Sequence, residues 1–194
     1  MRIGVISDVH CHVAALEAGL DMMAAEVDEV FVAGDVVYEY RFCNEVVGRL
    51  RDRGFPCIQG NHEMVLLGPG GVRARTAPGV DGDALSWLAE RPTRIDAQLG
   101  GRSITMVHST PWPPYNEYLT ENDGAWARCR DLDADVLITG HTHVPMVREV
   151  AGTLIVNPGS LGESREHGAR DQASFAVVDL DRLEARIVRF PNPG

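Results

Sequence analysis

The first sixty residues alternate short apolar runs with helical patterns, which constrains the fold more than any other feature of the chain. Arg2–Ser7 and Val30–Ala33 are rich in β-branched residues, as buried strands are. Val13–Glu26 and Phe42–Arg53 carry apolar residues at helical spacing, and the short run Pro56–Gln59 follows them. This βαβαβ alternation is typical of a parallel sheet, in which functional groups gather at the carboxyl ends of the strands.

The second half of the chain predicts hairpins. The turns Gly100-Gly101 and Ala151-Gly152 each separate two predicted strands. The predicted strands are Arg94–Leu99, Ser103–Val107, Val136–Thr139, Met146–Val150, Thr153–Val156, Phe175–Asp179 and Ala185–Phe190. The remaining predicted elements are helices at Asp81–Glu90 and Asn122–Asp131 and a loop at Leu67–Gly71. We therefore expect one α/β (α+β) domain over residues 1–194, with two packed sheets and helices outside.

Five polar segments follow the predicted strands and carry residues that bind metals. They are Asp8-Val9-His10, Gly34-Asp35, Gly60-Asn61-His62-Glu63, His108 and Gly140-His141-Thr142-His143. Together they supply two carboxylates, one carboxamide and four imidazoles, with His62 as one more imidazole. Each alone would more often be a turn residue or an interior histidine. Because all of these residues follow predicted strands of one chain, together they predict a site for two divalent cations, with open positions for a phosphate.

The spacing within the segments suggests how the ligands are shared. Side chains two residues apart on an extended segment point the same way, so Asp8 and His10 can reach one cation. By the same reasoning, His141 and His143 can serve neighbouring ions. The Asp35 carboxylate has two oxygens and can bridge two ions.

The composition of the chain limits the class of protein to which it can belong and the kind of partner that it can bind. The 194 residues are 44% hydrophobic and 24% charged, which fits a globular domain with its own core. The net charge is −10 and every basic residue is Arg, which argues against a long nucleic acid as partner. A small phosphate ester stays compatible, because two bound cations would add about four positive charges. There is no C-x-x-C spacing, signal peptide or membrane-spanning run, so we expect a cytoplasmic protein with reduced thiols.

In their order from Asp8 to His143, these motifs resemble the calcineurin-like metallophosphoesterase superfamily, and more closely its small prokaryotic phosphodiesterases. The resemblance implies a four-layer αββα sandwich of two mixed β-sheets flanked by helices, with a dinuclear metal centre. It implies that Asp8, His10 and His143 hold the first metal, that Asn61, His108 and His141 hold the second, and that Asp35 bridges them. The implied cofactor is a pair of divalent ions, with Mn²⁺ preferred and Fe, Zn²⁺, Ni²⁺ or Mg²⁺ as alternatives.

The same resemblance assigns His62 as the catalytic acid. A hydroxide between the metals would attack the phosphate, since one cation can lower the pKa of water from 15.7 to about 7. Protonated His62 would then give its proton to the departing oxygen. We expect Glu63 to lie behind the site or at the surface, because adjacent side chains diverge.

Two departures from the family pattern bear on the substrate. Protein phosphatases of this superfamily follow the bridging Asp with x-x-Asp-Arg, which gives a partner for the histidine and a clamp for the phosphate. Here the stretch is Val36-Val37-Tyr38-Glu39, so both groups are missing, which argues against protein substrates. Many of the small phosphodiesterases carry Cys at the position of His62, so hydrolysis of monoesters stays open.

Weaker features predict substrate contacts. Trp112 and Tyr115 follow His108 and could stack on a nucleobase, or pack in the core or in a dimer contact. Arg165 adds charge beside the Asn157–Gly162 loop or is solvated, and His12 touches substrate or caps the next helix. We predict a phosphodiesterase for small nucleotide-type substrates. The alternatives are a small-molecule phosphomonoesterase and a non-catalytic metal-binding scaffold. We expect no membrane partner, and a homo-oligomer stays open.

Overall fold

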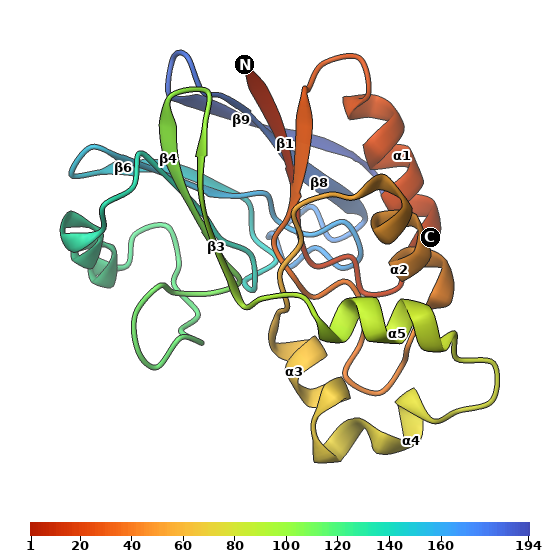
Figure 1. Cartoon of the computed structure of the whole chain (residues 1–194). Coiled ribbons are helices and arrows are strands. Elements are labelled where there is room, and N and C mark those ends of the chain that lie inside the picture. Colours follow the sequence, from red (N-terminus) through yellow and green to blue (C-terminus); the bar gives the residue numbers. More distant parts are fainter.

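The computed structural model describes residues 1–194 and contains two mixed β-sheets packed face to face (Figure 1). The first sheet has the strand order β2-β1-β8-β9, and the second has the order β3-β4-β5-β7-β6. The strands of the first sheet are β1 (Arg2–Ile6), β2 (Glu29–Val32), β8 (Gln172–Asp179) and β9 (Glu184–Pro191). Those of the second sheet are β3 (Arg94–Leu99), β4 (Arg102–Val107), β5 (Val136–Ile138), β6 (Met146–Val150) and β7 (Thr153–Asn157).

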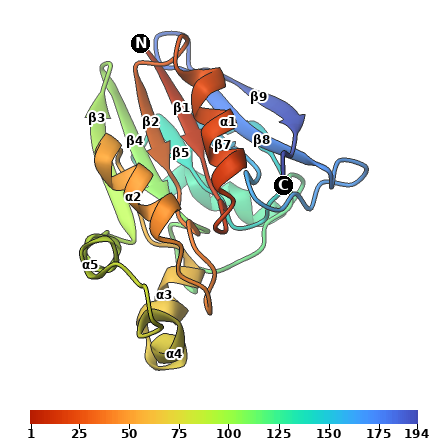
Figure 2. The same ribbon diagram turned by 90° about the vertical axis from the view of Figure 1, so that its right-hand side faces the viewer.

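The helices form the outer layers. They are α1 (Val13–Met23), α2 (Asn44–Arg53), α3 (Asn61–Leu67), α4 (Val72–Arg75), α5 (Gly82–Ala89) and the 3₁₀ helices η1 (Pro69–Gly71) and η2 (Gly124–Asp131). Figure 2 shows α1 and α2 in front of β1 and β2 of the first sheet. The helix η2 lies on the other side of the molecule, beside β6 (Figure 1). The two-sheet architecture predicted from the sequence is confirmed.

Side chains of the first sheet alternate between its two faces, and this divides the hydrophobic core into layers. Ile3 and Val5 of β1 face the second sheet and pack in a buried cluster that contains Met106 and Ile138. Ile6, next along β1, belongs instead to the cluster beneath the helices. A third cluster fills the space between the second sheet and η2. Because successive strand side chains point to opposite faces, one apolar strand stabilises two layers at once.

The chain departs from the predicted elements in several places, and the helices α3 and α4 were not predicted. The helix predicted to reach Glu26 ends at Met23. Pro56–Gln59 forms only an isolated parallel bridge between Val32 and Cys57 rather than a strand, and Pro56 has no N–H to donate to a ladder. The predicted loop Leu67–Gly71 instead contains the end of α3 and the 3₁₀ helix η1. The helix predicted at Asn122–Asp131 is the 3₁₀ helix η2.

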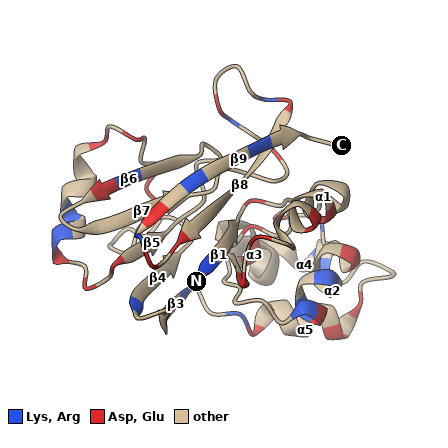
Figure 3. Cartoon of the chain, turned by 90° about the horizontal axis from the view of Figure 1, so that it is seen from above, with Lys and Arg blue, Asp and Glu red and all other residues tan.

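Arg residues and acidic residues are interspersed along the ribbon (Figure 3). Many of the Arg side chains pair with carboxylates, as Arg189 does with Glu166 and Arg94 with Asp96. No helix combines the length and the apolar character needed to cross a membrane.

Candidate metal centre

The polar segments that follow β1, β2, β4 and β5 meet where the carboxyl ends of these strands come together. Each segment begins within two residues of the end of its strand, at Asp8, Gly34, His108 and Gly140. The strand β1 runs parallel to β2, and β4 runs parallel to β5. Parallel neighbours end at the same edge of a sheet, so the topology gathers the predicted ligands in one place.

Six of the predicted ligands form two compact groups. Asp8, His10 and His143 make one group, and Asp35, His108 and His141 make the other. Within each group the possible ligand atoms all lie within 4.8 Å of one another. All six side chains are buried, and none is more than 7% exposed. A third group of His10, Asp35 and His62 joins the two, so the structure brings the predicted donors into one continuous cluster.

Buried atoms without partners test whether metal ions fit this cluster. Asp8 Oδ1, His10 Nδ1, Asn61 Oδ1, His108 Nε2 and His141 Nε2 have no hydrogen-bond partner in the protein. A buried polar atom without a partner is destabilising, and most such atoms in folded proteins are paired. The one other buried side-chain atom without a partner is Thr139 Oγ1, whereas these five atoms all belong to predicted ligands. Their mixture of nitrogen and oxygen donors is one that divalent transition metals accept, so the residues fit the cofactor.

Two of the histidines are oriented by carbonyl groups behind them. The Nδ1–H of His108 donates to the Ala33 carbonyl at 2.7 Å, and the Nδ1–H of His143 donates to the Glu163 carbonyl at 2.6 Å. A bond of this kind fixes the tautomer and leaves Nε2 as the ligand atom. In both rings Nε2 faces the carboxylates: His108 Nε2 lies 3.1 Å from Asp35 Oδ2, and His143 Nε2 lies 3.2 Å from Asp8 Oδ1.

Backbone N–H groups hold the two carboxylates. Asp35 Oδ1 accepts from the N–H of His62 at 2.9 Å, and Asp8 Oδ2 accepts from the N–H of His141 at 3.1 Å. Each of these bonds ties one ligand segment to another. The remaining oxygen of each carboxylate, Asp35 Oδ2 and Asp8 Oδ1, faces the histidine rings.

Most of the ligand residues adopt left-handed backbone conformations. The φ angles are 54° at Asp8, 48° at His10, 51° at Asp35, 70° at His141 and 58° at His143. The expectation that these pairs converge because their segments are extended was therefore wrong. Non-glycine residues in this region are strained, and such strain concentrates at functional sites. Tight turns, rather than a pleated strand, aim these side chains inward.

Glu63 supports the centre from behind. It is fully buried, which excludes the surface position that was one of its two predicted places. Its Oε2 accepts from the N–H of Asp35 at 2.8 Å and of Gly60 at 2.7 Å, and its Oε1 accepts from the N–H of Val37 at 3.0 Å. Burial raises the pKa of Glu63 to about 7, although the N–H groups of Gly60 and Val37 favour the carboxylate. One side chain thus joins the segments that carry Asp35 and Asn61.

Gly60 lets these two segments approach each other. A Cβ atom at Gly60 would lie 2.2 Å from Asp35 Oδ1 and 2.7 Å from the Asp35 backbone nitrogen. No side chain fits there, so the glycine is required by the close approach rather than by a turn.

His62 has an acidic partner that the sequence analysis missed. Its Nδ1 lies 2.5 Å from Oε2 of Glu39, and its Nε2 lies 3.8 Å from Asp35 Oδ2. The conclusion that the stretch after Asp35 supplies no partner was wrong, because Glu39 reaches the ring from the position where the phosphatases have Arg. Tyr38, beside Glu39, stacks on the His10 ring with centroids 4.9 Å apart.

The charges in the cluster perturb its titratable groups. Burial alone would raise the pKa of Asp8, yet the His10 and His143 rings hold it well below its usual range. Burial disfavours the charged form of His108, but the Asp35 carboxylate raises its pKa to about 10. Burial and the nearby His108 lower the pKa of His141 to about 4. A cation that binds His108 must therefore displace a proton.

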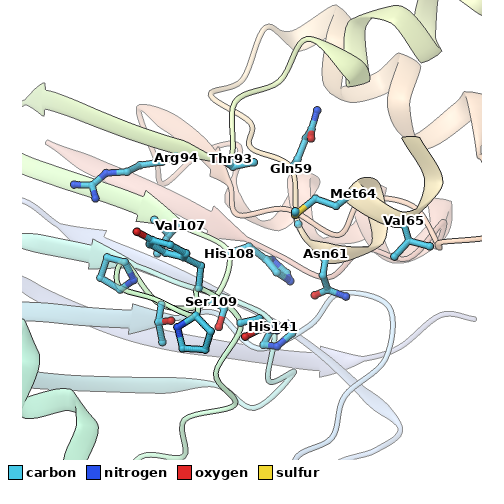
Figure 4. A pocket seen from close by; sticks show the side chains of 16 residues that line it. Gln59, Asn61, Met64, Val65, Thr93, Arg94, Val107, His108, Ser109 and His141 are labelled. Carbon is cyan, nitrogen blue, oxygen red and sulfur yellow. The ribbon is translucent and has the colours of Figure 1, made fainter. Parts of the chain in front are cut away.

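Two of the predicted substrate contacts, Tyr115 and Trp112, lie in different surroundings. Tyr115 is 63% exposed and lines a cavity of about 640 Å³ that reaches Asn61, His108 and His141 (Figure 4). Trp112 is buried in the third core cluster, and its indole N–H donates to a Glu117 carboxylate oxygen at 2.6 Å. Its position fits the packing alternative.

The other two predicted substrate contacts are Arg165 and His12. The Arg165 side chain is exposed, and its backbone N–H donates to the His143 carbonyl. His12 is half-buried at the start of α1 and makes no capping hydrogen bond, so the capping alternative is not observed.

Comparisons with known proteins show the family and the fold of the chain. A family model for the calcineurin-like phosphoesterase superfamily domain matches residues 1–183. A probable metallophosphoesterase of Methanothermobacter thermautotrophicus is 39% identical over 197 residues, which cover 100% of this chain and 95% of that protein. The crystal structure of a metallophosphoesterase from Sphaerobacter thermophilus is 28% identical with a TM-score of 0.78, and the match covers 98% of this chain and 88% of that one. A novel archaeal phosphodiesterase shares the fold at 20% identity, with a TM-score of 0.64 and coverage of 98% and 100%.

Proposed function

The chain belongs to the calcineurin-like phosphoesterase superfamily, whose members are metal-dependent phosphoester hydrolases, and we propose that it is a dinuclear phosphodiesterase for small nucleotide-type substrates. The proposal rests on the two buried groups of predicted metal ligands. Five atoms of the predicted ligands have no hydrogen-bond partner in the protein.

The two groups would hold one divalent ion each. Asp8, His10 and His143 would bind the first ion, and Asn61, His108 and His141 the second. Asp35, which forms one group with His108 and His141 and another with His10 and His62, would contact both ions. When bound, two such ions supply an attacking hydroxide near neutral pH and neutralise charge on the phosphate. We propose Mn²⁺ as the preferred ion, with Fe, Zn²⁺, Ni²⁺ and Mg²⁺ as alternatives, because mixed oxygen and nitrogen donors suit several of these ions.

His62 would protonate the leaving group. Glu39 holds its Nδ1, so the other ring nitrogen, Nε2, is the one directed to the cluster. The proton on Nε2 would pass to the oxygen that departs from phosphorus, and Nδ1 would keep its contact with the Glu39 carboxylate. A positioned general acid contributes about 10² to 10⁴ in rate. Glu39 acts through His62 and is a positioning residue.

The alternative functions differ in what they need from these residues. A metal-binding scaffold has no use for a leaving-group acid, so the pairing of His62 with Glu39 disfavours it. A small-molecule phosphomonoesterase would keep His62 as well, and the imidazole at this position is what favours that second candidate.

Release of nitrophenolate from two esters tests the proposal. We expect the purified protein with manganese to hydrolyse bis(p-nitrophenyl) phosphate faster than p-nitrophenyl phosphate, and to lose both activities when the metal is removed. Faster turnover of the monoester would support the phosphomonoesterase instead. Turnover that is independent of metal would contradict both.

A further inference from the structure

The large cavity beside the metal centre adjoins only one of its two halves. It has a volume of about 640 Å³ and lies between α3, which contributes Met64 and Val65, and the loop of Pro111, Pro114 and Tyr115. Figure 4 shows Asn61, His108 and His141 in its wall. All three belong to the half of the centre assigned to the second ion. The volume is within the range of about 300–1,000 Å³ typical of small-molecule sites.

The leaving-group acid lies beside the other half. The His62 ring is 4.6 Å from the His10 ring, measured between centroids, and neither residue lines the cavity. Glu39 and Tyr38, which contact these two rings, do not line it either. A phosphate that spans both halves would have its departing oxygen near His62. One of its other oxygens would then be directed to the cavity, so the cavity is placed for an ester group that does not leave.

The lining of the cavity indicates what kind of group fits. Met64, Val65 and Tyr115 provide apolar and aromatic surface. The one Arg side chain in the lining, that of Arg94, points away from His108 and Asn61 in Figure 4. Its guanidinium is already bound by both oxygens of Asp96, at 2.7 and 2.8 Å. A second phosphate would find no unpaired Arg side chain here, so the walls of the cavity beyond the metal ligands favour a neutral group.

Polar groups at the edge of the cavity add a preference for hydrogen bonding. The side-chain amides of Gln59 and Asn116 line it, and Gln59 uses only its NH₂ group, which donates to the carbonyls of Leu88 and Ala89. Its carbonyl oxygen is left as an acceptor. A flat, neutral group with donors on its edge, and with faces that stack on an aromatic ring, matches these walls.

We propose that this cavity binds the ester group that stays on the phosphate after cleavage, and that this group is a nucleoside. The inference rests on the proposed diesterase function and names the part of the substrate that the enzyme selects. The product would be a nucleoside monophosphate, which would keep its base against Tyr115 and Met64.

Two diesters with the same leaving group test the inference. Thymidine 5′-(p-nitrophenyl phosphate) and methyl p-nitrophenyl phosphate both release nitrophenolate and differ only in the retained ester group. We expect the KM of the wild-type protein to be about tenfold lower for the thymidine diester, which is the effect of one stacked base. Tyr115→Ala and Met64→Ala should each raise that KM towards the value for the methyl diester and leave the methyl diester unaffected.

Matched variants and a binding measurement separate this effect from a general loss of activity. Tyr115→Phe keeps the ring and should keep the preference. Met22→Ala removes a side chain that is 47% exposed on α1, outside the cavity, and should change neither KM. Calorimetry should show that the manganese-loaded protein binds thymidine 5′-phosphate more tightly than methyl phosphate, and that Tyr115→Ala removes the difference.

The outcomes distinguish this inference from the proposed function. Equal KM values for the two diesters in the wild-type protein, or an equal effect of Tyr115→Ala on both, would overturn the assignment of the cavity and leave the hydrolase intact. Failure to cleave either diester with manganese present would refute the proposed function, and the inference with it.

Discussion

Replacing Glu63 by Gln should weaken the metal centre, although Glu63 itself binds no metal. The Glu63 carboxylate is fully buried and accepts three backbone N–H bonds, from Asp35, Gly60 and Val37. Two of these donors belong to the segments that carry the ligands Asp35 and Asn61. The side chain therefore fixes the distance between a carboxylate and a carboxamide that must reach the same ion.

The expected loss of stability follows from the number of side-chain oxygens at position 63 that can accept hydrogen bonds. Gln has one side-chain oxygen, so its NH₂ group must face either Val37 N–H or the pair of N–H groups from Asp35 and Gly60. At least one buried donor then loses its acceptor, which costs about 1–3 kcal/mol. For a domain of this size, Tm falls by about 2–4 °C per kcal/mol, so we expect a decrease of about 2–12 °C. Loss of a group that orients a ligand typically lowers metal affinity by about 10- to 100-fold.

Thermal unfolding and calorimetric titration with manganese measure both effects. Glu184→Gln makes the same chemical change at an exposed position and should alter neither. Glu63→Ala removes both oxygens and should reduce Tm further than Glu63→Gln does. A Glu63→Gln protein with wild-type Tm would refute the hydrogen-bond reasoning. A lower Tm with unchanged manganese affinity would refute the link to the metal centre.

The remaining predictions concern three other side chains. Asp35→Asn should deplete bound metal because Asp35 lies between the two ligand groups, and full retention of two ions in elemental analysis would contradict its bridging role. His62→Ala should keep its metal and lose about 10²- to 10⁴-fold in turnover for alkyl leaving groups but less for nitrophenolate, whereas equal losses would argue against a proton donor. A hydrogen bond from Cys11 and the N–H groups at the start of α2 lower the pKa of Cys43 to about 6, whereas burial raises the pKa of the Cys57 thiol. Iodoacetamide should therefore modify Cys43 before Cys57 at pH 7 and more slowly below pH 6, and preferential labelling of Cys57 would contradict this order.

The sequence was sufficient to predict the two sheets and the meeting of six predicted ligands in one place. Ligand residues such as Asp8 and His108 come directly after apolar strands, and parallel strands bring their carboxyl ends together whatever the details of the loops. The glycine turns at Gly100 and Gly152 predicted both hairpins of the second sheet because a two-residue turn needs positive φ, which both glycines adopt.

Features that depend on contacts between distant segments could not be predicted. The approach of Glu39 to His62 spans 23 residues of sequence and depends on how the loop after β2 folds back. The bonds from Glu63 to the segment of Asp35 depend on the same loop. Left-handed conformations at Asp8 and His141 leave no mark in a sequence where these residues look like strand ends.

Trp112 shows the same limit for a single side chain. An aromatic loop after a metal ligand resembles a substrate contact, but the indole packs edge to face against Trp126, with ring centroids 6.2 Å apart. Its N–H is satisfied by Glu117, five positions later, and the Arg128 guanidinium lies 4.7 Å from the ring centroid. The carboxylate at Glu117 was the available signal, since a buried indole N–H needs an acceptor.

The positions of the charges explain how a protein of net charge −10 can bind a phosphate. No Arg side chain forms a hydrogen bond or ion pair with the seven predicted ligands, and the centre contains the carboxylates of Asp8 and Asp35. Without metal ions, the chain offers a phosphate no Arg side chain at this place, and the carboxylates of Asp8 and Asp35 oppose its binding. Two divalent ions would add about four positive charges, which exceed the two carboxylates and leave attraction for an anion. Affinity for the phosphate would then depend on the ions. Selectivity for the ester group would depend on neutral side chains such as Tyr115 and Met64, so the two properties can change independently.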